Sequence, residues 1–164
     1  MAHIDIQQIR SVLEQVCDPE IPVLSVTDLG IVREISVKNG EVSIEITPTY
    51  NGCPAMDMIG VNIKAALQEA GYHPVKVDLV WHPAWTTDMI TESGKAKLKT
   101  YGIAPPENEI GDKMALFADQ TMVPCPRCHS KNTLMVSQFG STACKAMYRC
   151  EDCKEPFDYF KCHR

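Results

Sequence analysis

The sequence contains no long apolar run and no apolar leader. No stretch of its 164 residues reaches the roughly 18 apolar residues that a membrane span requires. The first residues, MAHIDIQQIRSVLEQV, carry several charged side chains and lack the apolar region of a secretory signal. We therefore expect a cytoplasmic protein with no membrane partner.

The sequence also lacks the motifs of a redox enzyme. It has no glycine-rich nucleotide-binding loop and no Glu-x-x-His pair of the kind that binds two irons in helical bundles. Internal repeats and low-complexity tracts are absent as well. These absences argue against direct redox chemistry, so we expect no catalytic residues in the chain taken alone.

The net charge of −5 is unevenly distributed. Residues 1–102 hold 8 Lys/Arg and 13 Asp/Glu, whereas residues 122–164 hold 7 and 4. The acidic first part argues against nucleic acid as the main partner. The basic tail leaves a nucleic-acid-binding ribbon as an alternative, suggested also by its aromatic residues Phe139, Tyr148, Phe157, Tyr159 and Phe160. We expect these rings to pack around a metal instead, because a small ribbon has few other core residues.

Apolar periodicity predicts an α+β first domain with the order helix, hairpin, helix, strand, helix. Residues 6–16 and 55–71 repeat apolar side chains at helical spacing. Between them, Asn39-Gly40 predicts a two-residue hairpin turn, and the alternation in EVSIEIT predicts that one face of the sheet is buried. PVKVDLVW predicts a third strand and TTDMITESGKAKLKTYG a helical segment. We expect a small mixed sheet with helices packed against it.

A change in composition divides the chain. Pro105-Pro106 and the acidic residues after them predict a linker over residues 103–121. Residues 1–102 form the predicted first domain, and residues 122–164 form a small cysteine-rich ribbon. A module of about forty residues buries too little core to fold unaided, so we expect metal binding to supply its folding energy.

Two Cys-x2-Cys pairs in this ribbon give the strongest local pattern. Cys125-x2-Cys128 and Cys150-x2-Cys153 are separated by 21 residues. Each pair predicts a tight knuckle, and two knuckles can close a tetrahedral site of four thiolates. Such a site is expected in a reducing compartment, where disulfides are rare. Four sulfurs suit zinc or an iron–sulfur cluster, so the spacing leaves the metal open.

Further candidate ligands lie near the two pairs. Cys144 and Cys162 raise the number of thiols in the ribbon to six. They are either spare, packed side chains or additional ligands of a cluster or second metal. His129 and His163 could also bind metal, but beside six thiols we expect both to be bystanders.

One cysteine stands apart in the stretch TPTYNGCPAMD, residues 47–57. Gly52 allows a tight turn before Cys53, and Pro54 suits the first turn of the helix that follows. A thiol at a helix N-terminus lies at the positive end of the helix dipole, which lowers its pKa and favours the reactive thiolate. The alternative is a small, buried core residue, which is common for free cysteine.

Acidic side chains precede the hairpin in the stretch CDPEIPVLSVTDLG. Asp18, Glu20 and Asp28 either support Cys53 or belong to a solvated turn and cap. Cys17, directly before them, is expected in the core. His82, in WHPAWTTDM, is a weak candidate with no evident partner, and we expect the aromatic residues around it to be packed.

The stretches DPEIPVLSVTDLGIV, TPTYNGCPAMD, PAWTTDMIT and YGIAPP together resemble the SufT-like family of small cytosolic iron–sulfur assembly domains. The tail, CPRC followed by FGSTACKAMYRCEDCKEPFDYFKC, narrows the resemblance to a family from aerobic phenylacetate degradation. The resemblance covers nearly the whole chain except the linker. It implies a three- or four-stranded sheet with helices packed against it.

The resemblance also implies a function. It points to maturation of a multicomponent monooxygenase that epoxidises the ring of phenylacetyl-CoA, with its oxygenase and reductase components, and other iron–sulfur assembly proteins, as partners. The family's cysteine corresponds to Cys53, which implies transient binding of iron or a cluster there. The family's acidic motif corresponds to Asp18, Glu20 and Asp28, and its tail includes Cys144 and Cys162. An integral, non-catalytic subunit of the oxygenase complex is the alternative.

Overall fold

The computed structural model describes residues 5–106 and 122–161 of the chain. These residues form two compact units, each of which contains its own sheet. The first unit comprises the chain up to Trp85 together with Met89–Thr91, and the second comprises Thr86–Asp88 and the residues from Glu92 onward. Within the described residues, no helix has both the length and the apolar character that crossing a membrane requires.

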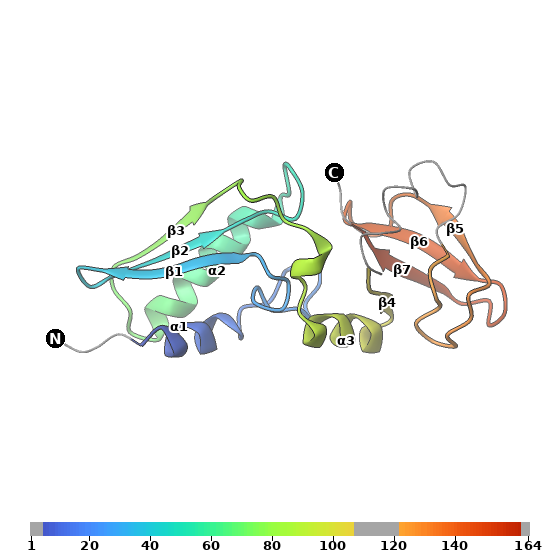
Figure 1. Ribbon diagram of the computed structural model, residues 1–164, viewed down its shortest axis with the longest axis horizontal. Helices are drawn as coiled ribbons and strands as arrows, with labels where there is room; N and C mark the ends of the chain where they lie inside the picture. Colours follow the sequence, from blue (N-terminus) through green and yellow to red (C-terminus); the bar gives the residue numbers. More distant parts are fainter. Residues whose placement is uncertain (1–4, 107–121, 162–164) are drawn as a thin grey trace. The chain divides into compact units, whose positions relative to one another are not determined.

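The first unit is a three-stranded mixed sheet with two helices. Its elements are α1 (Ile6–Leu13), β1 (Val32–Lys38), β2 (Glu41–Ile46), α2 (Ala55–Glu69) and β3 (Val75–Leu79). β1 and β2 are antiparallel, and β3 runs parallel to β2 after the α2 crossover. Figure 1 shows α2 lying along one face of this sheet, next to α1. The predicted α+β fold with a small mixed sheet is confirmed.

The hairpin forms where the Asn-Gly pair predicts it. Asn39 and Gly40 have φ angles of 53° and 83°, the left-handed conformation that a two-residue hairpin turn requires. Lys38 therefore pairs directly with Glu41. The alternation in β2 also has its predicted result, because side chains of one face are at most 2% exposed: Val42, Ile44 and Ile46.

The second unit contains α3 and a four-stranded sheet. The elements after β3 are the 3-10 helix η1 (Thr87–Met89), α3 (Glu92–Tyr101), β4 (Ile103–Ala104), β5 (Thr133–Ser137), β6 (Lys145–Cys150) and β7 (Pro156–Phe160). The strand order is β4-β7-β6-β5, in which β4 is parallel to β7 and the other neighbours are antiparallel.

The first residues of the predicted linker belong to this sheet. Ile103 and Ala104 pair with Asp158 and Tyr159 of β7. Both are apolar, and each is at most 5% exposed. Residues 107–121 lie outside the described part of the chain. The domain limits 1–102, 103–121 and 122–164 therefore stay a prediction.

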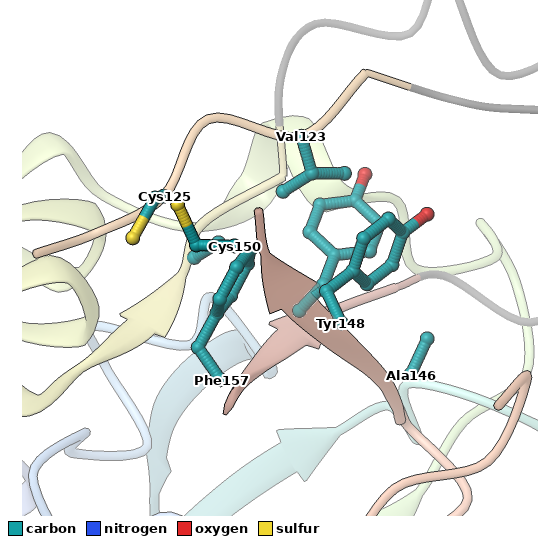
Figure 2. Packing of buried hydrophobic residues seen from close by; sticks show 8 residues of the cluster. Val123, Cys125, Ala146, Tyr148, Cys150 and Phe157 are labelled. Carbon is teal, nitrogen blue, oxygen red and sulfur yellow. The ribbon is translucent and has the colours of Figure 1, made fainter. Parts of the chain in front are cut away.

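Aromatic side chains build the core of the ribbon. Tyr148 stacks on Phe157 with ring centroids 5.8 Å apart and meets Tyr159 edge-on. Figure 2 shows Tyr148 and Phe157 in one cluster with Cys125 and Cys150. Four of the five aromatic residues that could have stacked on nucleic-acid bases are buried here: Tyr148, Phe157, Tyr159 and Phe160. The fifth, Phe139, is 59% exposed and lies under the Lys161 ammonium group.

Candidate metal centre and candidate thiol site

Two knuckles bring four sulfur atoms together in the second unit. The Sγ atoms of Cys125, Cys128, Cys150 and Cys153 all lie within 4.8 Å of one another. One pair of knuckle residues comes from the turn before β5, and the other starts at the last residue of β6. Each knuckle is closed by backbone hydrogen bonds, from the His129 N–H to the Cys125 carbonyl and from the Cys150 N–H to the Glu155 carbonyl. The predicted four-cysteine cluster is confirmed.

The geometry of this cluster fits a tetrahedral metal ion. With Zn–S bonds of about 2.3 Å, the sulfurs of a tetrahedral site lie about 3.8 Å apart. The Sγ atoms of Cys125 and Cys153 are 3.8 Å apart, and those of Cys128 and Cys150 are 3.5 Å apart. Among the described residues, these four cysteines are the only group of three or more metal-binding side chains with such spacing. A metal held by them would crosslink the two knuckles.

The electrostatics of the cluster also favour a bound cation. A hydrogen bond from the Cys153 backbone N–H, supported by that of Asp152, lowers the pKa of the Cys150 thiol to about 7. Although the Glu155 backbone N–H acts in the opposite direction, burial and the neighbouring sulfurs raise the pKa of the Cys153 thiol to about 12. Four thiolates so close together repel one another, and a divalent cation removes that repulsion.

The other candidate ligands of the ribbon lie apart from this cluster or outside the described residues. Cys144 is 4% exposed, and its Sγ lies 3.0 Å from the Thr142 hydroxyl. It is therefore a packed thiol that is not among the four clustered sulfurs. His129 follows the first knuckle in a left-handed conformation, with φ of 62°, and is likewise not part of the cluster. Cys162 and His163 are outside the part of the chain that the structure describes.

Cys53 lies where the sequence predicts it, in the turn between β2 and α2. Gly52 has a φ of 79°, which makes the turn possible, and Pro54 is the N-cap residue of α2. The Cys53 backbone N–H donates to the Tyr50 carbonyl, and the Cys53 carbonyl accepts from the Met56 N–H, both at 3.3 Å. The side chain is half-buried. It is therefore neither a fully packed core residue nor a freely exposed thiol.

The predicted lowering of the Cys53 pKa is wrong. Burial raises the pKa of this thiol above its ordinary value of 9.0, and this effect outweighs the hydrogen bonds from the Ala55 backbone N–H and the Tyr50 side chain, which lower it. The negative charges of Glu20 and Asp18 raise it further. The helix N-terminus acts as expected through Ala55, but loss of solvent around the sulfur is the larger effect.

Two of the three predicted carboxylates therefore act on Cys53. Asp18 is 7% exposed, and its Oδ1 atom accepts hydrogen bonds from the backbone N–H groups of Glu20 and Ile21 at 2.7 and 2.9 Å. These bonds fix the carboxylate within the turn.

Cys17, directly before Asp18, forms an isolated antiparallel β-bridge with Ser25. Extended backbone alternates its side chains, so Cys17 is exposed between buried Val16 and Asp18, and its predicted core position is wrong.

The third carboxylate, Asp28, has a structural setting. Its Oδ2 atom accepts from the Ser25 backbone N–H at 3.2 Å and from the Ser25 hydroxyl at 2.9 Å, while the Asp28 N–H donates to the Ser25 hydroxyl. This reciprocal pattern is a capping box. The Asp28 carbonyl also accepts from the Thr91 N–H. The Thr91 hydroxyl donates to Oδ1 of the Asp28 side chain at 3.3 Å, so Asp28 ties two segments of the first unit together through both its backbone and its side chain.

Tyr50 is the residue near Cys53 that sequence reasoning missed. Its side chain forms a hydrogen bond with the Cys53 thiol that favours the thiolate. The signal was available, because Tyr50 lies in the same stretch three residues before the cysteine.

The aromatic residues around His82 differ in burial. The predicted packing is confirmed for Trp85, which is 5% exposed and donates from Nε1 to the Leu29 carbonyl, and is wrong for Trp81, which is 48% exposed. His82 is exposed.

Comparison with known families assigns each of these sites to a domain type. Residues 6–79 match the iron–sulfur cluster assembly protein family, and residues 110–161 match the PaaD zinc beta ribbon domain. The protein therefore combines an iron–sulfur assembly domain, which contains Cys53, with a zinc ribbon, which contains the four-cysteine cluster.

A relative that spans nearly the whole chain identifies the family. The chain is 47% identical over 157 residues to a protein of Escherichia coli (strain K12) that is named as one of the subunits of 1,2-phenylacetyl-CoA epoxidase, covering 96% of this chain and 93% of that protein. The chain belongs to the PaaD family.

The first domain also has relatives that lack the ribbon. It is 33% identical to the Fe-S protein maturation auxiliary factor SufT of Staphylococcus aureus (strain USA300), covering 51% of this chain and 96% of that one. A crystal structure of a domain of unknown function from Bacillus anthracis superimposes with a TM-score of 0.52 at 27% identity, covering 56% of this chain and 89% of that one. The assembly domain therefore accounts for most of the length of both matched chains.

Proposed function

We propose that the protein is a maturation component of the phenylacetyl-CoA ring epoxidase and assists the assembly of its metal or iron–sulfur centre. The observation that carries the proposal is Cys53, a half-buried thiol beside Asp18 and Glu20 in a domain of the iron–sulfur assembly family. The relative named as an epoxidase subunit indicates which enzyme the protein would help to mature. On this proposal the chain is not catalytic by itself, and its activity is seen in the complex that it matures.

Cys53 is suited to transient binding of iron or a cluster. A thiol and nearby carboxylates offer one soft and several hard ligands. One thiol cannot complete the coordination of a cluster, which usually requires four protein ligands. The site would therefore hold its cargo only until a recipient supplies the missing ligands, and this weak retention suits a carrier better than a resident centre.

The raised pKa of Cys53 is compatible with such a role. The sulfur is protonated when the site is empty, because burial and the charges of Asp18 and Glu20 favour the neutral thiol. A metal cation must displace that proton to bind the thiolate. Asp18 and Glu20 are placed to attract the cation first, and either carboxylate can accept the released proton. The same negative charges that disfavour the thiolate alone would stabilise it with its metal.

The zinc ribbon would serve as the structural and docking part of the protein. The four clustered cysteines hold the metal, which crosslinks the knuckles and needs no exchange. This leaves the sheet surface of the second unit available for a recipient. We propose that the recipient is an oxygenase or reductase component of the epoxidase, with other iron–sulfur assembly proteins supplying the cargo.

Replacing Cys53 tests the proposal. Cys53→Ala should abolish growth on phenylacetate, because no other described thiol occupies this turn, and should leave the fold unchanged. Cys17→Ala is the matched control, since this thiol is exposed and precedes Asp18 in the same unit. It should grow normally. Normal growth of the Cys53 variant, with equal amounts of folded protein, would refute the assembly role.

An integral, non-catalytic subunit of the oxygenase is the second candidate, favoured by the name of the relative from Escherichia coli. The two roles differ in when the protein is needed. A maturation factor is dispensable once the other components are loaded, whereas an integral subunit is required at every turnover. Adding and omitting the chain in assays with components purified from a strain that contains it distinguishes the two.

A further inference from the structure

The outer edge of β3 is an unpaired strand edge in the first unit. β3 is the last strand in the order β1-β2-β3, and Figure 1 shows it at the border of the sheet. Within residues 5–106 and 122–161, β2 is the only strand that pairs with it. An open edge presents N–H and C=O groups to any strand that can approach.

The hydrogen bonds to β2 show which residues point outward. The Pro74 carbonyl accepts from the Val42 N–H, and the Val80 N–H donates to the Ile46 carbonyl, so the even-numbered residues bond to β2. Along a strand in a parallel pair, one residue directs both its N–H and its C=O toward the paired strand, and the next residue directs both of its groups to the other side. The odd-numbered residues Val75, Val77 and Leu79 therefore present their N–H and C=O groups at the free edge.

An apolar groove runs beside this edge. It lies between α2 and β3 and has a volume of about 380 Å³. Most of its lining is apolar, including Val61, Val77 and Leu79, and three charged residues also border it: Asp57, Lys64 and Lys76. Val61 is 63% exposed and Leu79 is 43% exposed, which is unusual for large apolar side chains on neighbouring elements. An added strand would therefore gain both backbone hydrogen bonds and apolar contacts.

The charges on β3 complement those of a second copy of the same strand. Lys76 and Asp78 alternate with Val75, Val77 and Leu79 along β3 and form an ion pair of 2.8 Å within the strand. If two β3 strands pair antiparallel around Val77, Lys76 of each copy stands opposite Asp78 of the other. These would be non-hydrogen-bonded pairs, in which side chains are closest. Val75 would then stand opposite Leu79, and every outward backbone group would be bonded.

Neighbouring registers are unfavourable. Shifting the pairing by one residue opposes outward-facing groups with inward-facing ones, so the hydrogen bonds are lost. Shifting it by two places Lys76 opposite Lys76, or Asp78 opposite Asp78, and like charges directly opposite destabilise a sheet. Asp78 also pairs in register with Glu45 of β2, so a lysine from a second copy would offset this local negative charge.

We propose that two copies of the chain associate through antiparallel pairing of their β3 strands, which joins the two three-stranded sheets into one continuous sheet. The interface is isologous, with its twofold axis at Val77. The α2 helix of each copy flanks the junction, and Val61 and Leu79 of both copies close the apolar groove. This inference does not depend on the proposed function, because it uses neither Cys53 nor the metal cluster.

Charge exchange on the full-length protein tests the proposal by sedimentation velocity over a range of concentrations. The wild type should form a concentration-dependent dimer. Lys76→Asp and Asp78→Lys should each weaken dimerisation by about tenfold or more, because each turns two attractive pairs into two repulsive ones. The double variant Lys76→Asp/Asp78→Lys restores opposite charges and should recover the wild-type affinity to within about threefold. Lys131→Asp, at an exposed position of the ribbon, is the control.

Mixing gives the sharpest result. The Lys76→Asp chain carries two acidic groups on β3 and the Asp78→Lys chain two basic ones, so an equimolar mixture should form heterodimers although neither variant dimerises well alone. A protein that stays monomeric at about 100 μM, a concentration far above the dissociation constant of a stable dimer, would overturn the proposal. So would a dimer that is indifferent to these changes, or an edge that accepts only a strand from another protein.

Discussion

At the scale of single residues, the state of Cys53 is decided by competing environments. The helix N-terminus and Tyr50 favour the thiolate, whereas burial and the carboxylates of Glu20 and Asp18 favour the thiol. The second set prevails, so the sulfur is protected from reagents at neutral pH. A thiol that becomes reactive only when a cation arrives is less exposed to oxidation than a permanent thiolate.

We expect the alkylation rate of Cys53 to rise with pH through a midpoint above 9.0, the ordinary value for the thiol. Glu20→Gln removes a charge that raises the pKa, so its midpoint should shift to lower pH. Tyr50→Phe removes a hydrogen bond that lowers the pKa, so its midpoint should shift to higher pH. Because the folded pKa exceeds the unfolded one, the group's contribution to stability is present below pH 9.0 and is lost as the pH rises through the folded pKa.

Peptide mass spectrometry of iodoacetamide-treated protein can follow Cys53 separately from the other thiols. Labelling of the exposed Cys17 in the same sample checks that the reagent is active. A midpoint for Cys53 below 9.0, or shifts of the same sign in the two variants, would contradict this account of the site.

At the scale of secondary-structure elements, the turn before β1 depends on one glycine. Gly30 has a φ of 70°, and a Cβ atom there would overlap the carbonyl oxygen and side chain of Met89. The neighbouring capping box of Ser25 and Asp28 fixes the turn, so the backbone has little freedom to move away. Local strain and a close approach of two backbones thus coincide at this position.

Gly30→Ala should destabilise the protein by about 2–4 kcal/mol, since left-handed strain and a backbone overlap add together. Gly71→Ala is the matched control, because Gly71 has a φ of 91° and no atom within 4 Å of a Cβ placed there. It should cost only about 1–2 kcal/mol, from strain alone. Urea unfolding of the first unit measures both; equal losses would show that the contact with Met89 is unimportant.

At the scale of the whole molecule, the two units differ in what stabilises them. The first has an apolar core between its sheet and α2, with several side chains fully buried, such as Ile44, Ile59 and Ile63. The core of the ribbon includes two of the metal-binding cysteines, Cys125 and Cys150. Loss of the metal would leave close, partly ionised thiols inside that core.

Removing the metal should therefore unfold the ribbon and spare the first unit. We expect one tightly bound metal per chain, in wild type and in Cys53→Ala alike, because Cys53 is not part of the cluster. After chelation, amide hydrogen exchange should accelerate about a hundredfold or more in β6, where protection depends on folding of the ribbon, and remain slow in α2. Cys150→Ser should reproduce this effect, and Cys144→Ser should not.

The metal content of anaerobically purified protein identifies the ion. Zinc alone would match the ribbon family. Iron with acid-labile sulfide, lost in Cys53→Ala, would instead make Cys53 a permanent ligand. Protection of β6 that survives chelation would show that the aromatic core is sufficient to fold the ribbon.

The sequence by itself determined the local features of this protein. The Asn39-Gly40 hairpin, the buried face of β2 and the four-cysteine cluster follow from turn chemistry, side-chain alternation and ligand spacing, all of which act over a few residues. The sequence motifs also indicated the family. These features are local, so they could be predicted without knowing how distant segments meet.

Only the tertiary structure decided the properties that depend on burial and on distant neighbours. The pKa of Cys53 is raised because chain packing removes solvent and brings Asp18 and Glu20 near the sulfur. Cys17 is exposed because its segment pairs with Ser25 in extended conformation. Ile103 and Ala104 are in a strand because β7, more than fifty residues later in the sequence, offers them a pairing edge. The spacing of a motif specifies which atoms can meet, but the fold determines how much water remains around them.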